Sequence, residues 1–169
     1  RMHSCRVRIR TLQECIRMLV GTVTGDGNLL LNIGPMPTGE FQAQEIANLK
    51  GIGRWLRQFG ESIYGTCGGP YHNGEWGGSC YKGRTLYLHV FQWAGDTLSL
   101  PPLKARVLRA DVLGGSPVEV EQSDAGLTLA LKTDRRDEAD TVIRVELDSP
   151  AEDEFIDGKP LDVSPPRKN

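Results

Sequence analysis

The chain has 169 residues, of which 38% are hydrophobic and 25% charged, and its formal net charge at pH 7 is −2. This composition is typical of a globular protein with one ordinary domain or two small ones. The nearly neutral charge gives no electrostatic reason to expect nucleic acid or an anionic membrane as a partner. No apolar run reaches the roughly 20 residues of a membrane helix, and the basic residues 1–10 lack the apolar core of a secretory signal.

The cysteines and histidines argue against a metal centre. The three histidines are scattered, and no CxxC pair occurs among the four cysteines, which are Cys5, Cys15, Cys67 and Cys80. We therefore expect no zinc site, and nothing in the sequence requires another cofactor. Cys67 and Cys80 flank a Gly-rich stretch, so a disulfide between them and free thiols both fit, and free thiols are the simpler interpretation.

The first regular element is a helix predicted over residues 11–23. Apolar residues recur there at spacings of three and four, which places on one face Leu12, Cys15, Ile16, Leu19, Val20 and Val23. The turn formed by Gly25, Asp26 and Gly27 ends this helix. A nearly continuous apolar run follows from Asn28 to Ile33, which is typical of a strand covered on both faces in a parallel sheet.

The alternation within residues 28–33 assigns the side chains to two faces. Leu29, Leu31 and Ile33 share one side, and Asn32 and Gly34 lie on the other. In a barrel, the aliphatic side should face the surrounding helices and the other side should face the lumen. Asn32 and Gly34 would then lie at the carboxyl end of the strand, where barrel enzymes build their active sites. We take both as candidate substrate-lining residues; the alternative for Asn32 is a structural role in tying down a loop.

A second helix is predicted over residues 41–59. Glu45 near its start and Arg57 near its end complement the helix dipole, and Gly60 suits the C-cap. Trp55 should pack against a neighbouring element. The expected buried stripe consists of Ile46, Leu49, Ile52, Gly53, Leu56 and Phe59.

Beyond residue 65 the pattern changes. Glycine recurs up to residue 83 without a helical or strand period, which predicts an interdomain loop. Residues 135–140 are predicted to form a charged loop without a further role. Short strands separated by turn residues are expected over 85–93, 97–100, 105–113, 118–122, 127–132 and 141–147. Strands of this length and spacing are typical of an antiparallel sandwich.

Together these elements predict an α/β remnant, made of the final β/α elements of a (β/α)8 barrel, followed by a small antiparallel β-sandwich domain. The expected division is 1–66 for the C-terminal remnant of a catalytic barrel, 67–84 for the Gly-rich interdomain loop, 85–150 for the accessory sandwich and 151–169 for an extended or frayed tail rich in proline and acids. The strand 28–33 would then lack the barrel strands that should flank it. We expect the missing barrel part, or another chain, to be needed to cover it, and the chain alone to be marginally stable or prone to aggregate.

Two long motifs carry a resemblance to a known family. GNLLLNIGPMPTG, at residues 27–39, and IGRWLRQFGESIYGTCGGPY, at residues 52–71, resemble the C-terminal part of the α-L-fucosidases of glycoside hydrolase family 29. Further on, KGRTLYLHVFQW, GDTLSLPPL and DTVIRVELDSPA are similar to the accessory sandwich of that family. The resemblance covers roughly residues 11–151, which is most of the chain.

The resemblance implies a retaining exo-glycosidase that removes terminal α-L-fucose from fucosylated glycans without a cofactor. Such enzymes use a carboxylate nucleophile and a carboxylic acid about 5 Å apart, flanking the scissile bond. In the family both lie upstream of the part matched here, so no catalytic residue is assigned in this chain, which alone should be inactive. Because fucosylated glycans usually lie outside the cytoplasm, the intact protein is expected to be periplasmic, lysosomal or secreted.

The acids that are present do not form a substitute pair. Asp26 would lie at the wrong end of a barrel for catalysis, and Glu40 lies in a turn before a helix. Glu45 is explained by helix electrostatics, Glu61 by the surface at the helix end, and Glu75 belongs to the loop. General acid–base catalysis needs two acids whose environments separate their pKa values, and no such pair is visible.

Two other functions fit the sandwich. A stand-alone carbohydrate-binding module would stack sugars on one or more of the aromatic residues Tyr71, Trp76, Tyr81 and Trp93. These residues form no recognisable platform in the sequence, and Trp93 ends an apolar strand that suits a core. A structural module would instead cover one end of the barrel and steady it, which is the role we expect for residues 85–147 within the intact enzyme.

Overall fold

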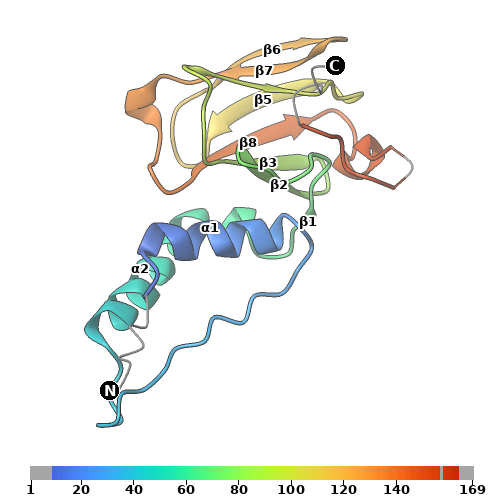
Figure 1. Ribbon diagram of the computed structural model, residues 1–169. Helices are drawn as coiled ribbons and strands as arrows, with labels where there is room; N and C mark the ends of the chain where they lie inside the picture. Colours follow the sequence, from blue (N-terminus) through green and yellow to red (C-terminus); the bar gives the residue numbers. More distant parts are fainter. Residues whose placement is uncertain (1–8, 157, 164–169) are drawn as a thin grey trace, which may run out of the picture.

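Two helices lie against one face of a β-sandwich in the computed structural model, which describes residues 9–156 and 158–163 (Figure 1). Thr11 caps the first helix through a capping box with Glu14, whose backbone N–H donates to the Thr11 hydroxyl at 3.1 Å. Neither long helix has the length and apolar character of a membrane span. The helical elements are α1 (Leu12–Val23), α2 (Ala43–Phe59) and the 3-10 turn η1 (Gly60–Ser62), so both predicted helices are confirmed.

The strands of the described residues form two antiparallel sheets. The first has the order β1-β2-β3-β8-β5, and the second has the order β4-β7-β6. The strands are β1 (Cys67–Gly68), β2 (Gly77–Lys82), β3 (Thr85–Val90), β4 (Thr97–Leu100), β5 (Val107–Val112), β6 (Glu119–Ser123), β7 (Gly126–Ala130) and β8 (Thr141–Leu147). The antiparallel sandwich predicted from the strand spacing is confirmed.

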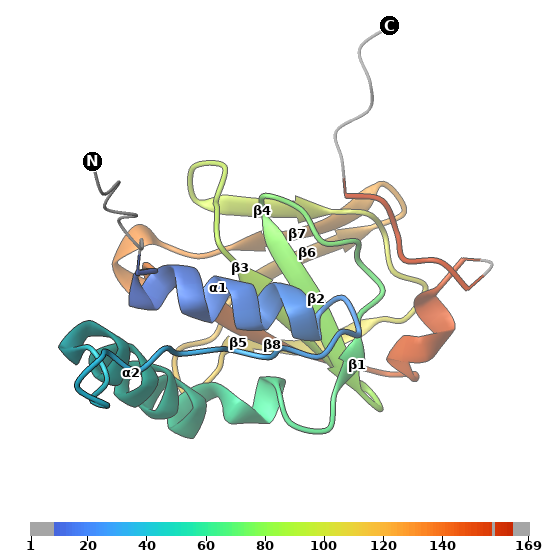
Figure 2. The same ribbon diagram turned by 60° about the horizontal axis from the view of Figure 1, so that its bottom comes forward.

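The five-stranded sheet is covered on both faces, by the second sheet and by the helices (Figure 2). On β3, Leu86, Leu88 and Val90 enter the core between the two sheets. Tyr87 and His89 alternate with them and contact residues of the helical layer. The apolar cluster on that side consists of Ile16, Val20, Trp55, Phe59, Ile63, Leu113 and Val142.

The strand predicted over 28–33 is not formed in this structure. Residues 26–42, which we call the strap, run from the end of α1 to the start of α2 without entering either sheet (Figure 1). Leu30 in the strap is 91% exposed. A strand needs a neighbour for its backbone hydrogen bonds, and the described residues provide none here.

The buried face of α2 differs from the predicted stripe. Asn48, Gly51, Trp55 and Phe59 are buried, which confirms Phe59 of the predicted stripe and the packing of Trp55 against a neighbouring element. Ile46 and Leu49, expected in the stripe, are instead 38% and 40% exposed. The helix therefore carries apolar side chains on two sides, and only one side is covered by described residues.

The Gly-rich stretch predicted as a loop contains β1 and β2, and β2 pairs with β3 over its whole length. Its glycines allow close packing. A Cβ atom on Gly69 would lie 2.3 Å from the Ser79 hydroxyl oxygen, and one on Gly78 would lie 2.5 Å from the Thr24 hydroxyl oxygen. The recurrent glycines therefore allow neighbouring segments to pack closely against this part of the backbone, and they do not indicate a flexible linker.

The segment after residue 150 packs on the sandwich, although it was predicted to be extended or frayed. Glu154, in the 3-10 turn η3 (Ala151–Glu154), is buried and accepts hydrogen bonds from the backbone N–H groups of Lys104 and Ala105, each at 2.7 Å. Leu161 forms a parallel bridge with Tyr71. The parts of the predicted remnant and tail at residues 1–8 and 164–169 lie outside the described residues.

Replacing Gly77 with alanine should destabilise the fold. Gly77 has a φ of 136°, and a Cβ atom there would lie 1.7 Å from the carbonyl oxygen of His89. We expect the free energy of unfolding, measured by urea denaturation, to fall by about 3 kcal/mol. The control is Gly95→Ala, because Gly95 has a φ of 65° but open space around its Cβ position. This control should lose only about 1 kcal/mol, and equal losses in both variants would contradict the argument.

Candidate functional site

The candidate substrate-lining residues lie on the strap. Asn32 is exposed and lines a hollow of about 200 Å³ together with Cys15 of α1 and Glu45 and Asn48 of α2. The backbone N–H of Gly34 lies 3.5 Å from Oε1 of Glu45. The structure thus brings both residues to the first half of α2. Their role in substrate binding stays a prediction, because no neighbouring strand places Asn32 in a barrel lumen.

Three of the carboxylates considered for catalysis hold the fold together. Asp26 accepts a hydrogen bond from a backbone N–H of β1 at 2.7 Å. Glu45 completes the capping box of α2. Glu61 accepts from the Tyr87 hydroxyl at 2.8 Å, and burial together with this contact raises the pKa of Tyr87. Each of the three therefore has a structural role.

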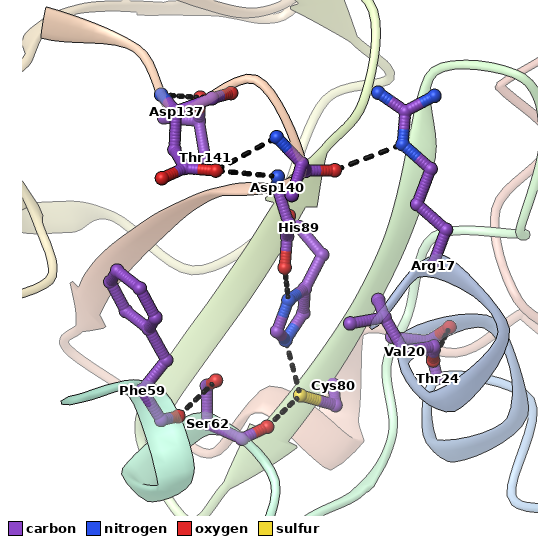
Figure 3. A network of polar contacts seen from close by, with 11 residues as sticks. Arg17, Val20, Thr24, Phe59, Ser62, Cys80, His89, Asp137, Asp140 and Thr141 are labelled. Atoms are coloured by element: carbon purple, nitrogen blue, oxygen red, sulfur yellow. Dashed lines mark hydrogen bonds and ion pairs between the residues drawn. The ribbon is translucent and has the colours of Figure 1, made fainter. Parts of the chain in front are cut away.

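A polar network is buried between the sheet and the helices (Figure 3). His89 in β3 places Nδ1 2.6 Å from Oδ2 of Asp140, which precedes β8, and Nε2 3.6 Å from Sγ of Cys80 in β2. The Cys80 thiol donates to the Ser62 carbonyl oxygen in η1 at 2.9 Å. Cys80, His89 and Asp140 are each 0% exposed, and we call these three residues the His89 network.

His89 is protonated in this network. Burial by itself lowers the pKa of His89, but the charge and hydrogen bond of Asp140, with a smaller contribution from Cys80, raise it from 6.5 to about 10. An imidazolium donates from both ring nitrogens, which matches the carboxylate on one side and the sulfur on the other. Oδ1 of Asp140 has no hydrogen-bond partner among the described residues, so the negative charge of the carboxylate is balanced by the positive charge of His89.

These residue types are those of a nucleophilic Cys–His–Asp arrangement, but their environment does not allow catalysis. None of the three side chains is reachable from solvent, and the thiol points to a backbone carbonyl rather than to a pocket. The network joins β2, β3 and the segment before β8 to η1. Its role is to fasten the sheet to the helical layer.

Arg17 fastens α1 to the same segment. Its guanidinium donates to the carbonyl oxygens of Ala139 at 2.9 Å and Glu138 at 3.0 Å. Residues 136–140 form a loop as predicted, but the prediction that this segment has no further role is wrong. A run of charges normally indicates a solvated loop, and the sequence contains no signal that Asp140 would be buried opposite a histidine 51 positions away.

The four aromatic residues considered for sugar binding do not all lie in one place in the structure. Tyr71 belongs to the sandwich core, and Tyr81 packs against Phe155. Trp76 and Trp93 come from different loops and line one hollow. Two of the four candidates are thus brought together.

The described residues contain no group of three His, Cys, Asp or Glu side chains arranged to hold a metal ion. Cys15, Cys67 and Cys80 are free thiols, so the disulfide left open by the sequence is not formed. Cys67 is exposed, whereas Cys80 belongs to the buried His89 network, and the two sulfurs therefore lie in different environments.

Comparisons of the sequence with known proteins converge on one family. A family model described as alpha-L-fucosidase matches residues 3–61. The plasma alpha-L-fucosidase of Homo sapiens is 43% identical over 56 residues, which are 33% of this chain and 12% of that protein. The alpha-L-fucosidase of Branchiostoma floridae is 29% identical over 131 residues, which are 72% of this chain and 29% of that protein. The chain thus spans less than a third of the length of these relatives.

Solved structures show the same relationship. Alpha-L-fucosidase isoenzyme 1 from Paenibacillus thiaminolyticus superimposes with a TM-score of 0.77 and 30% identity, over 87% of this chain and 37% of that one. An alpha-fucosidase from Thermotoga maritima has the same fold, with a TM-score of 0.70 and 22% identity over 83% of this chain and 36% of that one.

Sequence and fold together relate the chain to a family of glycoside hydrolases. It is related to the α-L-fucosidases of family 29 and corresponds to their C-terminal part, which confirms the resemblance of the motifs at residues 27–39 and 52–71.

Breaking the His89 network should change how stability depends on pH. Because the pKa of His89 rises from 6.5 to about 10 on folding, its stabilisation is complete below pH 6.5 and is lost as the pH approaches 10. Asp140→Asn should lower the free energy of unfolding by about 3–5 kcal/mol near neutral pH and flatten this decline. The measurement is urea denaturation at several pH values.

The control for that experiment is Asp134→Asn, which changes an exposed aspartate near the same segment. This control should keep both the stability and the pH dependence of the parent chain. Parallel pH profiles for Asp140→Asn and the parent would contradict a charged His89.

Proposed function

We propose that the chain is the C-terminal portion of a retaining α-L-fucosidase that hydrolyses terminal α-L-fucose from glycans. The observation that carries the proposal is the agreement between the family match at residues 3–61 and the superposition on a solved α-L-fucosidase over 87% of the chain. This chain alone lacks the catalytic carboxylates. Two carboxyl groups about 5 Å apart, which the retaining mechanism requires, would come from the remainder of the enzyme.

In this proposal α1, the strap and α2 belong to the closing part of a (β/α)8 barrel, and residues 28–33 form its last strand. The exposed apolar side chains support this assignment. Leu30 and Phe41 are exposed on the strap, and Ile46 and Leu49 are exposed on α2. Such a set normally marks a surface that another part of a protein covers. The missing barrel part, or another chain, would supply the neighbouring strands.

Asn32 and Gly34 acquire a function only in that completed barrel. Their positions at the end of the proposed strand would place them on the face where barrel enzymes bind substrate. The Asn32 amide could then donate to and accept from sugar hydroxyls, and the absence of a side chain at Gly34 would let the substrate approach the backbone.

The sandwich has a supporting role in the same proposal. Its five-stranded sheet is joined to α1 by Arg17 and to η1 by the His89 network. A module held in this way would steady the end of the barrel that α1 and α2 close. We place the intact enzyme outside the cytoplasm, as a periplasmic, lysosomal or secreted protein acting on fucosylated glycans. The relative named a plasma alpha-L-fucosidase supports this location.

The first test is the activity of the purified chain on a chromogenic α-L-fucoside. The chain alone should release no product above background, whereas the chain joined to an upstream segment encoding the rest of the barrel should be active. Light scattering should show association or aggregation for the chain alone and a stable species for the completed protein. Hydrolysis by the chain alone would contradict the proposal, and so would an inactive protein that is folded and complete.

The second test addresses Asn32 in the completed enzyme. Asn32→Ala should lower kcat/KM by about 10-fold, equivalent to about 1.4 kcal/mol, because a hydrogen bond to the sugar is lost. Asn28→Ala is the matched control, since Asn28 lies on the same side but at the other end of the proposed strand. Equal losses of kcat/KM in the two variants would remove Asn32 from the substrate site.

A further inference from the structure

A hollow opens at the edge of the sandwich between two loops and the C-terminal segment. Its volume is about 540 Å³, which lies within the range of roughly 300–1,000 Å³ of small-molecule sites. One loop contributes residues 72–76, the other contributes residues 92–94 and the start of β4, and residues 162–163 close the third side. The side chains that matter for recognition are those of His72, Glu75, Trp76, Gln92, Trp93 and Ser99.

The walls of this hollow are fixed by backbone hydrogen bonds. Gly74 and Gly77 exchange two such bonds, of 3.0 and 3.1 Å, and the Phe91 N–H donates to the Trp76 carbonyl oxygen at 2.8 Å. The His72 N–H donates to the Leu161 carbonyl oxygen at 2.8 Å, which holds the C-terminal segment in place. A site formed in advance binds its ligand with a smaller loss of conformational entropy.

Trp93 is a rigid aromatic surface in this hollow. The Arg136 guanidinium lies over its ring, 4.4 Å from the centroid, and also donates to Asp96 at 2.8 Å and to the Leu131 carbonyl oxygen. Trp93 lines the hollow and Arg136 does not.

Trp76 adds a second ring with a fixed orientation. Its indole N–H donates to the His72 carbonyl oxygen at 3.1 Å, and its ring meets Tyr71 edge to face at a centroid distance of 6.4 Å. The exposed side chains of Glu75 and Gln92 add hydrogen-bonding groups at the rim. The hollow therefore combines two aromatic rings with uncharged and acidic polar groups.

From this combination we propose that the hollow binds a pyranose unit of a glycan. A pyranose has an apolar C–H face that can lie on an indole ring, and hydroxyl groups that can form hydrogen bonds with Gln92 and Glu75. Among the described residues that line the hollow there is no lysine or arginine, whereas Glu75 is one of them, which disfavours an anionic ligand such as a phosphate. This site goes beyond the proposed hydrolysis, because it would let the sandwich hold a sugar residue itself.

The experiment is an NMR titration of the indole N–H signals of the full chain with L-fucose, D-galactose and N-acetyl-D-glucosamine separately, at a protein concentration at which light scattering detects no association. The chain has three tryptophans. Trp55 lies in the separate helical cluster and serves as an internal control. At least one sugar should shift the signals of Trp76 and Trp93 in a saturable way and leave that of Trp55 unchanged. The readout does not involve hydrolysis, so a negative result would leave the fucosidase proposal intact.

Two variants make the test specific. Trp93→Ala should weaken binding at least about 10-fold. Gln92→Ala, which changes an exposed side chain and should not disturb folding, should weaken it several-fold. Ser123→Ala, an exposed change on β6, is the control and should bind like the parent chain. Shifts of all three tryptophan signals, no saturable shift with any of the sugars, or unchanged binding by Gln92→Ala and Trp93→Ala would each overturn the proposal.

Discussion

The ion pair between His89 and Asp140 is the interaction on which the arrangement of helices and sheet depends. Both groups are completely buried, so the charge of each is compensated by the other, at 2.6 Å, rather than by solvent. Asp140 follows directly after Ala139, whose carbonyl oxygen accepts a hydrogen bond from Arg17 of α1. On the other side, His89 contacts Cys80, and the Cys80 thiol donates to a carbonyl oxygen of η1, which follows α2. The short segment before β8 is therefore connected by hydrogen bonds to α1 and, through His89 and Cys80, to η1.

This attachment explains why the two halves of the chain have different surfaces. The sandwich and the inner sides of α1 and α2 are covered, whereas the strap and the outer side of α2 expose Leu30, Ile46 and Leu49. Burying apolar side chains is the main favourable term in folding, so their exposure is costly. The uncovered side is the one at which the proposed barrel would continue.

Much of the architecture could be predicted from periodicity, because both helices and the later strands carry patterns that match their burial. The prediction failed where burial depends on partners distant in sequence. The glycines around β2 were mistaken for loop residues, since sequence does not show that Gly78 meets Thr24. Ile46 and Leu49 follow a helical stripe that this chain does not cover. Asp140 looked solvated because its partner belongs to another strand.

The candidate sites show the same limit. Asn32 and Gly34 could be proposed as substrate-lining residues from the alternation of side chains along residues 28–33. That alternation defines two faces only when neighbouring strands pair with this segment. Trp76 and Trp93 were among four aromatic candidates, and only the folded loops show that these two share a hollow. Nothing in the sequence pointed to Arg136 as the cation that orients Trp93.

The central position of β8 has a consequence for biosynthesis. β8 pairs with β3 on one side and with β5 on the other, although it is the last strand among the described residues. Until residues 140–147 have been synthesised, the first sheet is therefore split into two unconnected parts, and His89 lacks its partner Asp140. The helical layer can dock firmly only after synthesis of the sandwich is nearly finished. Nascent chains would thus expose apolar surface and unpaired strand edges until late in translation, which favours aggregation.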